Sequence, residues 1–251
     1  MLVQIRADRL RLITQHHHAL LSGELAAAWQ GFPGQGVRLP LVLILATALH
    51  DLAWQPMDRS PLLDPASGRP HSFVTYPLEE KLRHYREGIA AMSRIHPYVG
   101  LLGSLHYTTF RGTEGLEAFQ ARERQRREHL KEQLGLTARE EALLQIHLRY
   151  LKLFDYFSLF ICLTPPPATK ASHPSWLQPS HFAQDPGGHR FHLIWQDENH
   201  LVVDPFPFPD VLPLRIPYRD LPDTTYTSAP ALQAAWEASV PSYWSVTLIP
   251  A

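Results

Sequence analysis

The sequence predicts a mainly α-helical protein, in which a helical bundle carries an added antiparallel β-sheet. Three observations lead to this prediction. Apolar residues recur at helical spacing through most of residues 14–162. The composition then changes at a proline-rich segment, residues 163–167. Beyond it, short segments alternate between apolar and polar residues, as strands do. We therefore predict a helical domain with N-terminal strands at 1–163 and a small β-rich region packed on it at 164–251.

The elements of the first domain are bounded by recognisable start and stop signals. Residues 1–14 alternate and are expected to form one or two short strands, which are candidates to join the C-terminal sheet. Pro40 and Pro97 suit the first turns of helices, and Thr137 begins a capping-box pattern. Gly135 ends a strongly charged helix. The expected helices cover residues 14–29, 39–54, 78–95, 98–110, 114–134 and 138–162.

The C-terminal region is expected to contain four or five strands and one short helix at 229–238. Its alternating segments read FHLIW, HLVVDPFPF, LPLRIPY and SVTLIP.

Composition limits the function classes. The net charge of the 251-residue chain is −1, so no nucleic-acid partner is expected. The longest apolar run, residues 39–49, is shorter than the roughly 20 residues that span a membrane. The single cysteine, Cys162, excludes an internal disulfide, and the N-terminus lacks the apolar core of a signal peptide. We expect a cytoplasmic protein with no membrane partner.

A His-Asp doublet, His50-Asp51, interrupts the apolar segment 39–54. Buried polar groups cost several kcal/mol unless they are paired, so this doublet needs partners. His18, His106 and Asp155 each interrupt an apolar face of another predicted helix. Helical bundles build metal sites from such inward-facing groups on separate helices. We therefore predict that these five residues bind a divalent metal ion, with Mn, Fe, Zn or Mg as candidates.

The order His, then His-Asp, then Asp on successive helices resembles the HD-domain metal-dependent phosphohydrolases. The resemblance implies an HD-like helical bundle in which His18, His50, Asp51 and Asp155 bind one metal. It also implies that Asp51 is both a ligand and the group that orients the attacking water. Histidines between the doublet and the last Asp hold a second metal in some members of that superfamily. His106 lies in this interval.

Nearly the whole chain also resembles a bacterial group, domain-of-unknown-function family 3891. This second resemblance implies no particular activity. The matching segments are RLITQHHHALLSGELA at 11–26, ALHDLAW at 48–54, LLDPASGRP at 62–70, SLHYT at 104–108, LKLFDYFSLFICL at 151–163 and VVDPFPF at 202–208.

Three functions are compatible with this ligand set. The first is a metal-dependent hydrolase of a phosphate ester or nucleotide-like small molecule, with Asp51 and His106 as catalytic residues. The second is a di-iron oxygenase of the HD type, which needs further ligands and for which His84 is the extra candidate. The third is a non-catalytic binding module stabilised by its metal.

Basic residues near the predicted ligands are candidates to bind a substrate anion. Arg149 and Lys152 precede Asp155 in one helix, and Arg111 follows His106 by five residues. Guanidinium groups suit phosphate because they donate two parallel hydrogen bonds. We therefore expect an anionic small molecule as the partner of this site.

Overall fold

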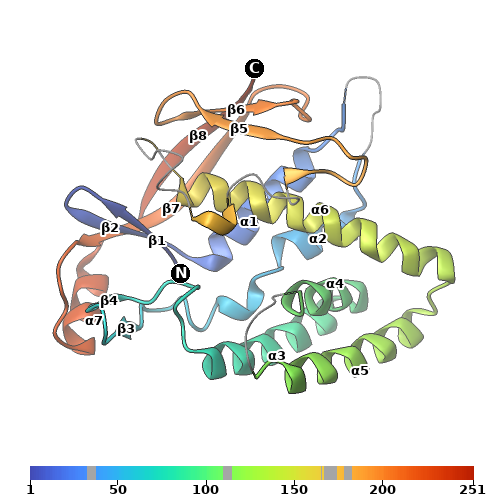
Figure 1. Ribbon diagram of the computed structural model, residues 1–251, viewed down its shortest axis with the longest axis horizontal. Helices are drawn as coiled ribbons and strands as arrows, with labels where there is room; N and C mark the ends of the chain where they lie inside the picture. The colour runs from blue at the N-terminus through green and yellow to red at the C-terminus, as the bar shows by residue number, and fades with distance from the viewer. Residues whose placement is uncertain (33–37, 110–114, 165, 167–173, 178–182) are drawn as a thin grey trace.

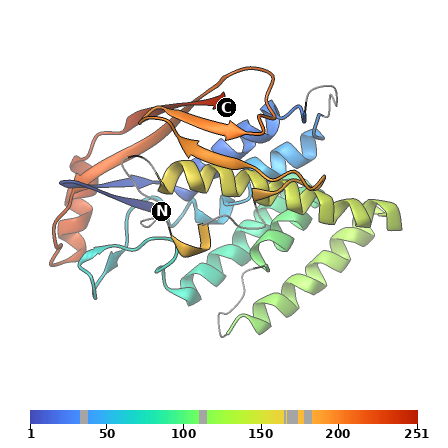
Figure 2. The same cartoon turned by 45° about the horizontal axis from the view of Figure 1, so that its top comes forward.

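The computed structural model describes residues 1–32, 38–109, 115–164, 166, 174–177 and 183–251. A curled six-stranded sheet lies along one side of the molecule, α1 and α6 cross beneath it, and α3, α4 and α5 lie on the far side of these helices (Figures 1 and 2). The helices are α1 (Gln15–Ala28), α2 (Leu41–Ala48), α3 (Leu78–Ile95), α4 (Pro97–Tyr107), α5 (Glu117–Leu134), α6 (Ala138–Leu163) and α7 (Ala229–Ala238), with 3-10 turns η1 (Leu52–Trp54) and η3 (Ser175–Leu177).

The large sheet collects strands from both ends of the chain, in the order β1-β2-β7-β8-β6-β5. All its pairs are antiparallel except β6 with β8, which is parallel. A separate short ribbon pairs β3 (Leu63–Asp64) with β4 (Arg69–Pro70). The strands of the large sheet are β1 (Leu2–Arg6), β2 (Arg9–Ile13), β5 (His192–Trp195), β6 (His200–Asp204), β7 (Leu212–Pro222) and β8 (Ser242–Pro250).

The predicted fold class, a mainly α-helical bundle with an added antiparallel sheet, is therefore wrong. The protein is α+β, and its sheet is mixed and large. Alternation in the sequence identifies strands but not their partners, and here β2 pairs with β7 across more than 190 residues of sequence. The apolar core also continues from the helices into the inner face of the sheet, where Val203, Leu214 and Val246 are buried.

Local signals set most helix boundaries as predicted. The Thr14 side chain accepts a hydrogen bond from the backbone N–H of His17 and begins α1. Thr137 and Glu140 form the capping box of α6, and Gly135, with φ +60°, ends α5. The helix predicted at 39–54 is the exception, because α2 ends at Ala48 and a 3-10 turn follows.

A glycine allows α1 and α2 to approach closely. A Cβ atom on Gly23 would lie 2.5 Å from the Cβ of Ala48 and 2.9 Å from its Cα. Gly23 lies five residues after His18 and Ala48 lies two residues before His50, so this contact sets the distance between the two histidines.

We expect Gly23→Val to force α1 and α2 apart. Overpacking of this kind costs about 1–3 kcal/mol, which lowers Tm by several degrees in a chain of this length. The same displacement separates His18 from His50 and weakens any metal binding that needs both. Thermal unfolding and Mn²⁺ titration check the result, with Ala27→Val on the exposed face of α1 as the control. Unchanged Tm and affinity in Gly23→Val would contradict the expectation.

Candidate metal centre

His18 enters the centre from the first turn of α1 and is 1% exposed. Its Nδ1 atom lies 2.8 Å from the Ser158 hydroxyl, and its Nε2 atom lies 2.9 Å from Oδ2 of Asp51. Ser158 also contacts Ser22 at 2.7 Å, so a short polar network links α1 to α6. This network fixes the orientation of the His18 ring, with Nε2 directed at the cluster.

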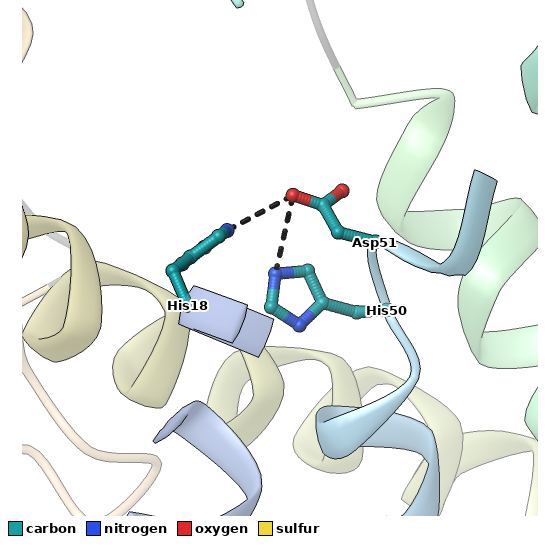
Figure 3. Close-up of side chains that lie close together, drawn as sticks. All are labelled: His18, His50 and Asp51. Atoms are coloured by element: carbon teal, nitrogen blue, oxygen red, sulfur yellow. Dashed lines mark hydrogen bonds and ion pairs between the residues drawn. The ribbon is translucent and has the colours of Figure 1, made fainter. Parts of the chain in front are cut away.

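His50 and Asp51 lie at the break between α2 and η1, not inside a helix. His50 Nδ1 donates a hydrogen bond to the Thr47 carbonyl at 2.7 Å. In a continuing helix that carbonyl would accept from the backbone N–H of residue 51. The His50 side chain therefore takes a backbone acceptor at the end of α2, and its Nε2 atom faces Asp51 (Figure 3).

His106 and Asp155 complete the cluster from α4 and α6. The His106 ring is 5.0 Å from the His50 ring, centroid to centroid. Asp155 places Oδ1 3.4 Å from Nε2 of His50. Four of the five side chains are buried, whereas that of Asp155 is 19% exposed. The structure thus brings together all five residues predicted from the sequence.

The distances between imidazole nitrogens and carboxylate oxygens are compatible with shared metal binding. Two atoms bound at about 2.1 Å to one ion cannot lie more than about 4.2 Å apart. His18 Nε2 lies 2.9 Å from Oδ2 of Asp51 and 3.9 Å from Oδ1 of Asp155. His50 Nε2 lies 3.9 Å and 3.4 Å from the same two oxygens. These four imidazole–carboxylate distances are within the limit. Two overlapping sets of side chains could hold a metal ion, and the first consists of His18, His50 and Asp51.

His106 belongs to a second group, with His50 and Asp155, whose donor atoms lie within 4.8 Å of one another. His50 Nε2 is buried and makes no hydrogen bond of good geometry among the described residues, although it lies 3.4 Å from Oδ1 of Asp155. A metal ion is a natural partner for this nitrogen, because Nδ1 is already committed to Thr47.

The electrostatics keep both carboxylates ionised. Burial alone would raise their pKa values, but the charge of His50 and contacts from the imidazoles outweigh it and lower the pKa of Asp51 and of Asp155. Burial opposes protonation of His50 as well, yet Asp51 and Asp155 raise its pKa to about 9. For His106, burial and then the His50 charge lower the pKa to about 4. His106 is therefore a neutral imidazole at pH 7, beside a protonated His50 and two carboxylates.

Sequence reasoning missed the groups that orient the ligands. The Tyr107 hydroxyl donates to Oδ1 of Asp51 at 3.2 Å, and burial followed by the Asp51 charge raises its pKa well above the usual value. Ser158 orients His18, and the Thr47 carbonyl orients His50. Tyr107 follows His106 directly, and Ser158 lies one turn after Asp155, so proximity in sequence was the available signal.

The other predicted site residues lie in different places. His84 contacts Arg83, Glu80 and Glu87 of its own helix and is in neither ligand group. Arg149 donates to the carbonyl of Asp185 at 3.0 Å.

Two further residues were predicted to bind the substrate anion. Lys152 lines a cavity of about 510 Å³ together with His106 and Asp155. Arg111 lies outside the described residues.

The fold and the site together define an α+β protein with a buried His/Asp cluster suited to a divalent metal ion. No helix in the described part of the chain is long and apolar enough to cross a membrane. The chain belongs to the family described as protein of unknown function (DUF3891), whose model matches residues 1–223 and so includes the whole cluster. No curated protein and no solved structure matches it.

Proposed function

We propose that this protein is a metal-dependent hydrolase of phosphate esters. The observation that carries the proposal is the convergence of His18, His50, Asp51 and Asp155, whose imidazole nitrogens and carboxylate oxygens lie 2.9–3.9 Å apart. The order of these residues is similar to that of the HD-domain phosphohydrolases, which supports the same reading. Because His50 has only Nε2 available and belongs to both ligand groups, the cluster forms one centre.

The bound ion would polarise a phosphoryl oxygen and lower the pKa of a water molecule. Asp51 has one oxygen toward the two imidazoles and the other held by Tyr107, so it has a fixed orientation for positioning that water. His106 is neutral at pH 7 and lines the cavity, so it is placed to accept a proton from the water and return one to the leaving oxygen.

The reaction is a simple hydrolysis. The water oxygen forms a new bond to phosphorus as the bond from phosphorus to the ester oxygen breaks. The ester oxygen leaves with a proton as an alcohol, and inorganic phosphate is the second product. No oxidation or reduction occurs.

Metal analysis and activity measurements on the native protein test the proposal. Mn²⁺-loaded protein is expected to release inorganic phosphate from phosphomonoesters or nucleotides, or to convert phosphodiesters to a monoester and an alcohol, and chelated protein is not. Absence of hydrolysis of every ester would contradict it. Bound iron with substrate-dependent oxygen uptake would instead favour the oxygenase. In the described structure His84 joins neither ligand group, so nothing beyond the five predicted residues supports a second iron.

A further inference from the structure

The cavity beside the metal centre has a volume of about 510 Å³, within the range of small-molecule sites. One face of α6 lines it with Lys152, Asp155, Tyr156 and Leu159. Residues three and four apart share a helix face, so these side chains follow one another along the wall. The face changes from charged at the metal centre to apolar further along the helix. The α6 wall is therefore polar only at the end near the metal centre.

A similar stripe on α3 supplies a second apolar wall, with Leu78, Leu82 and Tyr85. Lys81 lies on the same stripe, and its Nζ atom donates to the backbone carbonyl of Phe73 at 3.2 Å. The Lys81 ammonium group is thus hydrogen-bonded to the backbone at the cavity wall. Lys152 lines the cavity beside His106 and Asp155, and its charge contributes to lowering the pKa of His106 after burial and the charge of His50.

Aromatic and aliphatic side chains continue toward the surface. The rings of Phe73 and Trp176 meet edge to face with centroids 5.8 Å apart. Trp176 is 44% exposed and Val74 is 57% exposed, although both line the cavity. An apolar ligand group that covers this water-exposed apolar surface gains binding free energy from the hydrophobic effect.

We propose that the substrate is a phosphomonoester with an aromatic leaving group. Its phosphoryl group lies at the metal centre beside Lys152, and its ring packs against Tyr156 and Trp176. This inference rests on the proposed function and specifies the substrate class. Nucleosides are disfavoured because the described side chains around Trp176, namely Phe73, Val74, Leu78 and Leu177, are apolar and offer a base and a ribose no hydrogen bonds.

Binding of two phosphonates tests the substrate class without requiring turnover. Benzylphosphonate carries the aromatic ring, and methylphosphonate is the matched control without it. Calorimetric titration of Mn²⁺-loaded protein is expected to give an affinity at least roughly tenfold higher for benzylphosphonate, as burial of an aromatic ring implies. Comparable titrations with adenosine monophosphate are expected to show weaker binding than benzylphosphonate.

Two variants test the apolar end and the charged end of the cavity independently. Trp176→Ala is expected to weaken benzylphosphonate binding several-fold and leave methylphosphonate binding unchanged. Lys152→Met keeps the aliphatic stem and is expected to weaken both phosphonates. Trp236→Ala, on α7 and away from the cavity, is the control and changes neither affinity.

Equal affinities for the two phosphonates, with both still dependent on Mn²⁺, would overturn the aromatic subsite and leave the proposed function intact. Stronger binding of adenosine monophosphate would do the same. Benzylphosphonate binding that is tight but independent of Mn²⁺ supports the apolar subsite and counts against the metal centre. Failure of both phosphonates to bind overturns the inference.

Discussion

Replacing both His50 and Asp51 by alanine is expected to abolish metal binding and, with it, phosphate release. The double variant removes His50, which belongs to both candidate ligand groups, and Asp51, which belongs to one of them. Changing residues that merely orient metal ligands typically lowers affinity 10–100-fold, so loss of two ligands should exceed about 100-fold. Metal content after purification and Mn²⁺ titration measure the effect. Wild-type metal content in the double variant would refute the centre.

Two further variants serve as controls for this result. Asp51→Asn keeps the shape of the side chain while removing its charge, so it should remain folded by circular dichroism and still bind metal weakly. His129→Ala removes an exposed imidazole on α5 and should bind metal like the wild type. Loss of metal in His129→Ala as well would show that the ion is bound elsewhere.

Removal of the metal is expected to lower the thermal stability of the wild-type protein. An ion that binds only the folded state stabilises it by RT ln(1 + [L]/Kd), about 2.7 kcal/mol at a hundredfold excess over Kd. For a chain of this size, that corresponds to a Tm difference of roughly 5–11 °C. The physical reason is that the ion compensates the charges of the carboxylates of Asp51 and Asp155, which otherwise depend on protonated His50.

Differential scanning calorimetry of chelated protein, with and without added Mn²⁺, measures this difference. The variant with alanine at positions 50 and 51 is the matched control and should show no rise in Tm with Mn²⁺. A similar rise in that variant would mean that Mn²⁺ acts at another site. No rise in the wild type, even at millimolar Mn²⁺, would contradict a metal centre of useful affinity.

The local structure was largely predictable because its causes are local. Thr14, Thr137 and Gly135 act on the turns in which they lie, and the structure confirms the helix boundaries that they predict. The end of α2 was missed because its cause is one side-chain contact, from His50 to the Thr47 carbonyl. Periodicity of apolar residues carries no information about such a contact.

The residues of the candidate metal centre were also predictable, because each is a polar group on an otherwise apolar face. Buried polar groups need partners. The sequence therefore predicts one shared cluster, formed by His18, His50, Asp51, His106 and Asp155. Their mutual geometry was not predictable. The close approach of α1 and α2 at Gly23, and the orienting hydroxyls of Tyr107 and Ser158, emerge only when separate helices pack.

The sequence by itself determined most of the helices, the strands of the large sheet, and the five polar residues of the cluster. Side-chain periodicity and helix capping depend on residues a few positions apart, so the local sequence specifies them. Only the tertiary structure decided that strands from both ends form one mixed sheet, and that the cluster adjoins a cavity with apolar walls. Strand pairing and cavity walls depend on contacts between residues far apart in the chain, which no local pattern specifies.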